Sequence, residues 1–249
     1  MRLTKNKGLY QLTFMMPNLF PVSCYFVEEE DGLTLIDTAL PYSVKGIMNT
    51  AAQIGKPITR IVLTHAHNDH IGALDGLKSK LPDSQVYISE RDAKLLKGDA
   101  TLEPQEHQTP IKGRVPKPGK IVTKPDVLLR DGDRIGSLAA VSSPGHTPGS
   151  MSFQDTRSGA MIAGDAFQSK GGLAVSGRLK LLFPFPAMAT WSKETSVSSA
   201  RKLLELNPTL LAVGHGAMLE HPQQTIARVI ADAEKALRGS AGKGSRSHA

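Results

Sequence analysis

Short apolar stretches separated by turn residues open the chain and predict β-strands. Residues 10–14, 24–27 and 33–36 are rich in β-branched and aromatic side chains, and an Asp-Gly pair before the last stretch is typical of a hairpin turn. The continuous apolar run within 60–64 predicts a strand that is buried on both faces. Later strands are expected at 86–88, 138–141, 151–154, 160–163 and 210–213.

Segments with helical spacing of apolar residues alternate with these strands. Residues 43–54 place four apolar side chains on one face and end at Gly55. Leu74, Leu77 and Leu81 show the same spacing. Further helices are expected at 89–98, 192–206 and 225–237. The alternation predicts an α+β fold in which two sheets pack together with helices outside.

Two segments lack a clear period. Residues 99–125 are rich in Pro, Lys and Gln, and loops of this length are often functional or mobile. Residues 239–249 are expected to be a flexible tail, of a kind that expression vectors also add. The remainder, residues 1–238, is expected to form a single domain.

Composition is ordinary for a globular protein, with 40% hydrophobic and 21% charged residues. No run of about 18 apolar residues occurs, and the first residues do not form a signal peptide, so a cytoplasmic location is expected. The single cysteine, Cys24, excludes an intrachain disulfide and a thiolate-rich zinc site. The net charge is +7, and part of the excess of basic residues lies in the 99–125 loop and in the tail. We interpret these residues as solvated surface.

The densest group of potential metal ligands lies between a predicted buried strand and a predicted helix. The sequence THAHNDH holds three histidines and one aspartate within six residues, namely His65, His67, Asp69 and His70. Such a group cannot pack in an apolar core without unsatisfied ring nitrogens. Imidazole and carboxylate ligands suit zinc, and also iron, manganese or cobalt. A chance surface cluster is disfavoured because further ligands follow in the chain.

Three such candidates each come after a predicted strand. His146 lies between two Pro/Gly turns in SPGHTPGS, and Asp165 and His215 lie in AGDA and VGHG. Taken alone, Asp165 could cap a helix and His215 could be a core histidine. Taken with the first group, they indicate one metal site.

The order HAHNDH, PGHTPGS, GD and GHG resembles the metallo-β-lactamase superfamily over about residues 10 to 238. The resemblance implies a four-layer αβ/βα sandwich with two metal ions at one sheet edge. It implies one metal bound by His65, His67 and His146, a second bound by Asp69, His70 and His215, and a bridging Asp165. Asp37 matches an acidic position that orients a ligand histidine, although it could instead cap the helix near residue 43.

Such a site predicts a hydrolase. Two adjacent divalent ions, expected to be zinc with iron, manganese or cobalt as alternatives, lower the pKa of a shared water. The resulting hydroxide would bridge the metals and attack a carbonyl carbon or phosphorus. Asp69 is the expected catalytic residue, because it can accept a hydrogen bond from the hydroxide and later return a proton.

An ester, lactone or thioester is the expected substrate. The best-known β-lactamases of the superfamily resemble one another in a cysteine at the second metal, which this chain lacks there, so β-lactam hydrolysis is at most a side activity. Glyoxalase II-like enzymes add a helical region after the last ligand, and acyl-homoserine lactonases add a tyrosine after the bridging aspartate; neither is found here. Alternatives are a phosphodiesterase or nuclease, a mononuclear-iron sulfur dioxygenase and a non-catalytic binding module.

Large apolar side chains between 167 and 191 are the expected substrate pocket. They are Phe167, Phe183, Phe185, Met188 and Trp191. Near the metals, such a patch could accept an acyl chain, and a small separate core or a dimer contact is an equal alternative. The expected partner is a small-molecule substrate, with no nucleic acid or membrane, and a homodimer is the assembly this patch would allow.

Overall fold

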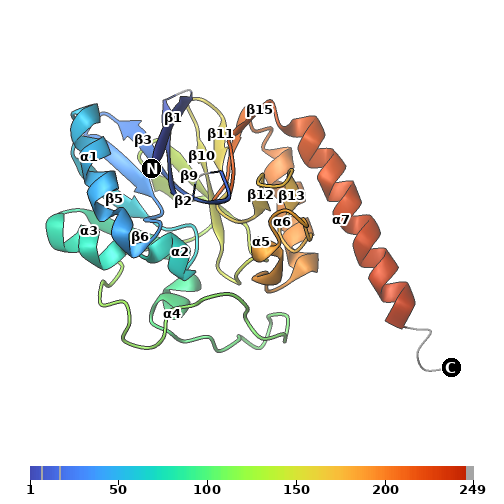
Figure 1. Ribbon diagram of the computed structural model, residues 1–249. Helices are drawn as coiled ribbons and strands as arrows, with labels where there is room; N and C mark the ends of the chain where they lie inside the picture. Colours follow the sequence, from blue (N-terminus) through green and yellow to red (C-terminus); the bar gives the residue numbers. More distant parts are fainter. Residues whose placement is uncertain (7, 17, 245–249) are drawn as a thin grey trace.

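The structure, a computed structural model, describes residues 1–6, 8–16 and 18–244 of the chain, and the side chains of these up to residue 239. Two β-sheets pack face to face, and helices cover both outer faces (Figure 1). This is the predicted four-layer αβ/βα sandwich, so the predicted fold class is confirmed.

The first sheet has the strand order β1-β2-β3-β4-β5-β6-β7. Strands β1 to β4 pair antiparallel as successive hairpins, whereas β4 to β7 pair parallel. Helices connect the parallel strands, as that pairing requires. The strands are β1 (Arg2–Asn6), β2 (Leu9–Met16), β3 (Phe20–Glu29), β4 (Gly32–Ile36), β5 (Ile58–Val62), β6 (Gln85–Ser89) and β7 (Val127–Leu129).

The second sheet has the order β15-β14-β11-β10-β9-β8, in which β11 and β14 are parallel. Its strands are β8 (Arg134–Ile135), β9 (Leu138–Ser142), β10 (Met151–Asp155), β11 (Ala160–Ile162), β14 (Leu210–Ala212) and β15 (Leu219–Glu220). A small hairpin of β12 (Phe167–Gln168) and β13 (Ala174–Val175) lies apart from both sheets.

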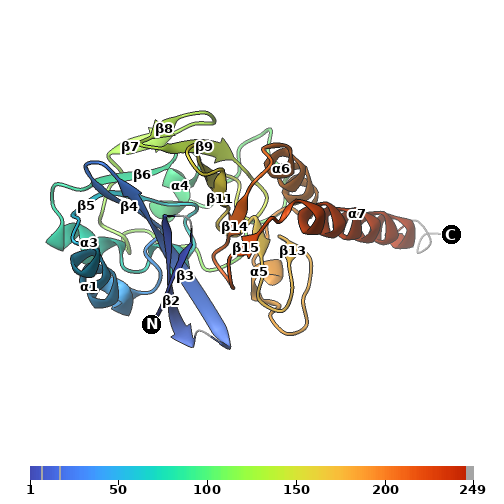
Figure 2. The ribbon, with the colours of Figure 1, turned by 90° about the horizontal axis from the view of Figure 1, so that it is seen from above.

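Helices flank the two sheets on opposite sides, as the view from above shows (Figure 2). The first sheet is covered by α1 (Val44–Ile54), α3 (Leu74–Lys80) and α4 (Asp92–Leu96), and the second by α6 (Lys193–Glu205) and α7 (Gln223–Gly244). Two short helices, α2 (Asn68–Ile71) and α5 (Phe185–Met188), lie in loops. No helix of the described chain is both long and apolar enough to cross a membrane.

The core has three apolar layers, because consecutive strand residues face opposite sides of a sheet. In β4, Leu35 packs against α1 and α3 whereas Ile36 faces the second sheet. In β5, Ile61 and Val62 divide in the same way. The continuous apolar run at 60–64 therefore does form a strand buried on both faces, as predicted.

Some elements differ from their predicted extent. Residues 99–125 contain no helix or strand, as expected. The last helix continues to Gly244 and so passes into the predicted tail, whose residues 245–249 lie outside the described residues. The unpredicted strands β1, β7, β8, β12, β13 and β15 are short or exposed and show little pattern.

Candidate metal centre

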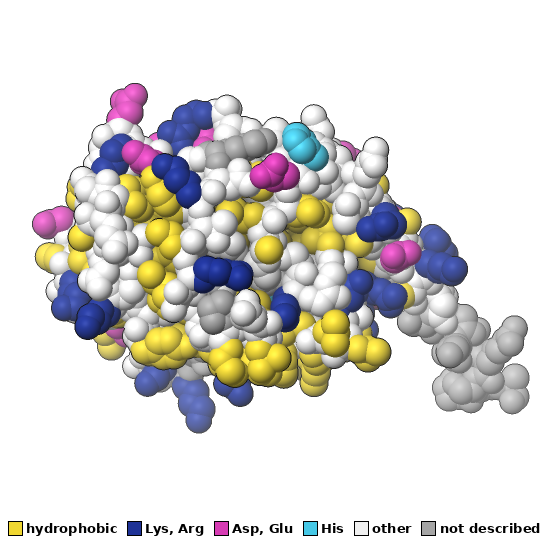
Figure 3. Space-filling model, turned by 45° about the horizontal axis from the view of Figure 1, so that its top comes forward, with side chains coloured by type: hydrophobic (Ala, Val, Ile, Leu, Met, Phe, Trp, Pro, Cys, Tyr) yellow, Lys and Arg dark blue, Asp and Glu magenta, His cyan; other side chains and the backbone are white. Residues whose placement is uncertain are grey.

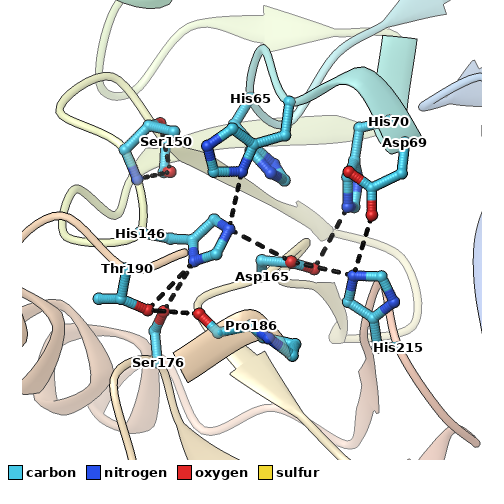
Figure 4. A network of polar contacts seen from close by, with 12 residues as sticks. His65, Asp69, His70, His146, Ser150, Asp165, Ser176, Pro186, Thr190 and His215 are labelled. Carbon is cyan, nitrogen blue, oxygen red and sulfur yellow. Dashed lines mark hydrogen bonds and ion pairs between the residues drawn. The ribbon is translucent and has the colours of Figure 1, made fainter. Parts of the chain in front are cut away.

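All seven predicted ligands come together where strands of the two sheets end. Figure 4 labels six of them, all but His67. Four of them lie in the loop after β5 and in α2, and three follow β9, β11 and β14 of the second sheet. Their donor atoms form three overlapping groups, and within each group the atoms lie within 4.8 Å of one another. The groups are His65 with His67 and His146, His65 with His70 and Asp165, and Asp69 with His70 and His215.

Asp37 and Thr64 orient two of the imidazoles. Asp37 Oδ2 accepts hydrogen bonds from His70 Nδ1 at 2.7 Å and from the Thr64 hydroxyl at 2.8 Å. Because Thr64 Oγ1 gives its proton to Asp37, it acts as an acceptor for His65 Nδ1, which lies 3.0 Å away. Both rings therefore turn Nε2 toward the centre, and both of these buried atoms have no hydrogen-bond partner in the described structure.

Backbone carbonyls orient two further rings, those of His67 and His215, so that one nitrogen of each ring faces the centre. Nε2 of His67 donates to the carbonyl of Lys112 at 2.9 Å. Nδ1 of His215 donates to the carbonyl of Pro21 at 2.8 Å. A carbonyl can only accept, so the proton of each ring lies on its outer nitrogen and the inner nitrogen is bare.

A chain of hydroxyl groups orients His146 (Figure 4). Thr190 Oγ1 donates to the carbonyl of Pro186 at 2.7 Å, so it acts as the acceptor for Ser176 Oγ, 2.8 Å away. The oxygen of Ser176 is then the acceptor for Nδ1 of His146 at 3.0 Å. His146 therefore also turns a bare Nε2 inward.

Three of these inner nitrogens lie close to the carboxylate of Asp165. Its Oδ2 lies 3.3 Å from His146 Nε2 and 3.1 Å from His215 Nε2, and its Oδ1 lies 3.4 Å from His70 Nε2. His146 Nε2 also faces His67 Nδ1 at 3.0 Å. Two lone pairs at this separation repel unless a cation lies beside them, and imidazole with carboxylate suits zinc and related metals. The residues thus fit a metal centre.

Burial and charge set the protonation of these groups. Burial lowers the pKa of His146 to about 3 and lowers that of His65 well below its ordinary value, which keeps both rings neutral. Burial raises the pKa of Asp165, but His215 and His70 outweigh it and bring it well below the ordinary value. Burial also lowers the pKa of His70, but the carboxylates of Asp165 and Asp37 outweigh this effect and raise the pKa well above its usual range. A metal that binds His70 therefore displaces a proton.

Asp69 is the most exposed of the seven side chains, at 36%. Its Oδ2 lies 3.5 Å from His215 Nε2. Burial raises its pKa, but His70 and His215 outweigh this and lower it, so the group is ionised at neutral pH. Asp69 therefore lies at the open side of the centre as a negatively charged acceptor.

Asp92 in α4 connects the two ligand loops, a role that the sequence analysis did not identify. Its buried carboxylate accepts hydrogen bonds from the backbone of Ala66 at 3.0 Å, the hydroxyl of Thr147 at 2.7 Å and the backbone of Gly149 at 2.8 Å. Burial raises the pKa of Asp92 to about 6, against the lowering effect of these donors. A lone aspartate after Ser89 carries no sequence signal for this role.

Two glycines also fit closely against ligand side chains. A Cβ at Gly214 would lie 2.2 Å from Oδ1 of Asp165, and one at Gly113 would lie 2.4 Å from Nε2 of His67. Gly113 belongs to the 99–125 loop, which the sequence indicated as functional or mobile. In the structure this loop passes over His67, because the backbone N–H of Asn68 donates to the carbonyl of Arg114 at 2.8 Å.

Two of the predicted pocket residues form an aromatic group beside His215, and a third follows them in the chain. The ring of Phe183 lies 5.4 Å from that of His215, and the ring of Phe185 lies 5.3 Å from Phe183. Met188 follows in α5 and is 67% exposed. Phe20, which was not predicted, joins them with its ring 5.5 Å from Phe185.

The other two predicted pocket residues have different surroundings. Phe167 is fully buried in the apolar layer that α6 and α7 cover, so its side chain belongs to the core. Trp191 is buried beneath the 99–125 loop, where its Nε1 donates to the carbonyl of Thr109 at 2.9 Å. Its backbone N–H donates to the carbonyl of His146 at 3.0 Å, so it supports a ligand loop. The structure thus places Phe167 in the core and Trp191 beneath the loop, and their role in a substrate pocket stays a prediction.

Comparison with known proteins places the chain among metal-dependent proteins. The model of the metallo-beta-lactamase superfamily matches residues 17–215. YobT of Bacillus subtilis (strain 168) is 56% identical over 94% of this chain and 100% of its own length. The probable metallo-hydrolase YflN of the same organism is 30% identical over 84% of each chain. The crystal structure of TTHA1623 in a di-iron-bound form superposes with a TM-score of 0.62, at 27% identity over 86% of this chain and 96% of that one.

Proposed function

Because the chain belongs to the metallo-β-lactamase superfamily, we propose that it is a dinuclear metal-dependent hydrolase of an ester, lactone or thioester. The observation that carries this proposal is the orientation of the histidines. Each of the five donates a proton from its outer nitrogen, so each turns its other nitrogen toward one centre.

Two divalent ions would be held by two sets of three side chains. The first set is His65, His67 and His146, and the second is Asp69, His70 and His215. Asp165 would contact both ions, since its two oxygens face His70 on one side and His146 on the other. When bound, such ions lower the pKa of water toward neutrality and polarise a carbonyl group. Zinc is the expected metal, and the di-iron form of the similar TTHA1623 makes iron the first alternative.

Asp69 is the proposed catalytic residue. Its lowered pKa keeps it ionised, and its partial exposure lets a substrate and a water approach it. A carboxylate in this position accepts a hydrogen bond from the attacking water, which orients the water's lone pair toward the substrate carbonyl. It then holds the water's proton and returns it to the leaving oxygen or sulfur.

The aromatic rings beside His215 favour an acyl substrate. Phe20, Phe183 and Phe185 form a contiguous apolar group, and Phe183 contacts the His215 ring. An acyl chain would bury apolar surface there, whereas the charged phosphate of a phosphodiester would not. This group supports an ester, lactone or thioester over a nucleic-acid substrate.

The test is proton release from a matched substrate panel. A long-chain acyl lactone, an S-acylglutathione, a β-lactam and a phosphodiester are compared with enzyme loaded with zinc, iron, manganese or cobalt. We expect the acyl substrates to dominate and His65→Ala and Asp69→Ala to lose at least about a hundredfold in kcat/KM. Turnover of the phosphodiester alone would move the protein to the nuclease branch. Unchanged turnover in Asp69→Ala with full metal content would refute the role of Asp69.

A further inference from the structure

An exposed apolar face lies beside the candidate metal centre. Two distant segments form it, the turn between β2 and β3 and residues 179–188. Its most prominent side chains are Met15, Met16, Leu19, Leu181, Leu182 and Met188. Leu181 and Leu182 are 89% and 81% exposed, so they protrude from the surface and do not line a groove.

Contacts between the two segments make this one continuous face. The ring of Phe20 lies 6.2 Å from that of Phe183 and 5.5 Å from that of Phe185. Nζ of Lys170 also donates to the carbonyl of Asn18. The β2–β3 turn and the segment before α5 lie side by side in Figure 2, and apolar side chains gather along the lower edge of Figure 3.

The charged residues in the two segments, and next to them in the sequence, are all positive. Residues 1–27 and 166–193 contain no Asp or Glu. Arg178 and Lys180 lie next to the protruding leucines in the sequence, and Lys170 contacts the β2–β3 turn. The side chains of Lys180 and Leu182 both lie within 4 Å of where a Cβ at Gly171 would be. Nη1 of Arg2 lies 3.4 Å from Oδ1 of Asn18 in the β2–β3 turn. A partner for this face therefore has to combine an apolar interior with negative charge.

We propose that the apolar face binds the surface of an anionic lipid bilayer. The protruding leucines and methionines would enter the boundary between headgroups and acyl chains, and the cations around them would contact lipid phosphates. Lysine and arginine reach such phosphates while their methylene groups stay in apolar surroundings. The sequence argument against a membrane partner rested on the lack of a spanning segment, and binding at the interface needs none.

A second copy of the chain fits the face less well. In a symmetric dimer the same patch would meet itself, which would bring two sets of Arg178 and Lys180 together without an acidic residue between them. If the proposed hydrolase function also holds, binding would place the lipid on the side of the centre where the ring of Phe183 lies 5.4 Å from that of His215, and an amphiphilic ester would reach the centre from there.

The test is flotation of the full chain with two kinds of vesicle at low ionic strength. One is phosphatidylcholine alone, and in the other about a third of the lipid is phosphatidylglycerol. We expect at least about tenfold tighter binding to the anionic vesicles, and loss of that difference at high salt. Each of Arg178→Ala and Lys180→Ala should weaken binding about fivefold.

The double variant Leu181→Asp/Leu182→Asp should lose binding at least about tenfold. Its matched control is Val122→Asp/Leu128→Asp, which changes two exposed apolar side chains in the 99–125 loop and in β7 and should bind as the unchanged protein does. Hydrolysis of a water-soluble ester serves as a separate readout and should be equal in both variants. Absent binding, equal binding to both vesicles, or a dimer that Leu181→Asp/Leu182→Asp dissociates would overturn the proposal.

Discussion

His70 Nδ1 lies 2.7 Å from Oδ2 of Asp37, and this contact decides which nitrogen of the ring faces the centre. Asp37 itself has a φ of 60°, a left-handed conformation that Asp and Asn adopt more readily than most residues. The carboxylate also accepts the backbone N–H of Thr64 at 2.7 Å, which ties the end of β5 to the same point. The position of His70 is therefore set by a residue outside the seven ligands.

Asp37→Asn should weaken metal binding without a change of fold. Asn keeps the backbone conformation, but its NH2 group cannot accept the proton of His70 Nδ1, so the ring is driven toward the tautomer with a protonated Nε2. We expect about a 10- to 100-fold loss of affinity at one of two metal sites, measured by titration of the metal-free protein. Asp232→Asn, on the exposed surface of α7, is the control. Equal affinity in both variants would show that Asp37 does not orient His70.

Removal of the metal should lower stability. In the metal-free protein the bare nitrogens of His67 and His146 face each other at 3.0 Å, and Asp165 Oδ1 is buried without a hydrogen-bond partner among the described residues. Binding at 100 to 1,000 times Kd stabilises by roughly 3 to 4 kcal/mol per site, so the midpoint of thermal unfolding should fall on chelation and recover when zinc is added. An unchanged midpoint, with removal verified by elemental analysis, would count against a metal centre.

Asp92 should impose a pH dependence on stability. Its pKa is raised from the ordinary 3.8 to about 6 by burial, so the folded protein binds this proton more tightly than the unfolded chain. The protonated carboxyl group therefore adds to the free energy of unfolding. This stabilisation, on the order of 3 kcal/mol, is fully present below pH 4 and is lost as pH rises to about 6. Asp92→Asn cannot titrate there. The difference in unfolding free energy between the metal-free forms of the two proteins, from urea titrations, should therefore shift in favour of the variant between pH 4 and pH 6.

A constant difference across that range would contradict the raised pKa of Asp92. Asp92→Asn also loses stability because some of the three donors to the carboxylate would face an amide NH2. That loss is the same at every pH, so it does not change how the difference between the two proteins varies with pH.

Gly214→Ala should displace Asp165 while leaving the backbone relaxed. The added Cβ would lie 2.2 Å from Asp165 Oδ1 and 2.6 Å from Cε1 of His70, and Gly214 has no positive φ. We expect at least about a tenfold loss of metal affinity, as for other changes that move a ligand. Gly239→Ala in α7, where a Cβ meets nothing within 4 Å, is the matched substitution and should leave metal content unchanged. Full metal content in Gly214→Ala would show that the centre tolerates the displacement.

The ligand set was predictable because its residues are chemically conspicuous and each follows an apolar strand. Four of the candidate ligands lie within the six positions from His65 to His70, and Asp165 and His215 each come three residues after a buried strand. The strands themselves were predictable where burial imposed a pattern, as in β4 and β5. The side chains of β1 are mostly exposed, so the sequence there carries no such pattern.

The remaining site features depend on contacts between distant segments. Asp92 reaches Thr147 and Gly149 across more than fifty positions, and Lys112 offers its carbonyl, which any residue could supply. Phe167 and Phe183 look alike in the sequence, yet one lies in the core and the other borders His215. The local sequence pattern predicts that a side chain is apolar, but it does not predict which layer of the fold that side chain packs against.

The metal centre takes its donors from both halves of the chain. In each of the three donor groups, two residues come from positions 65–70 and the third is His146, Asp165 or His215. The first of these groups is complete only when the chain has reached His146, 76 positions after His70. A complete set of donors therefore requires that strands of both sheets have folded, so neither half of the chain holds such a group by itself.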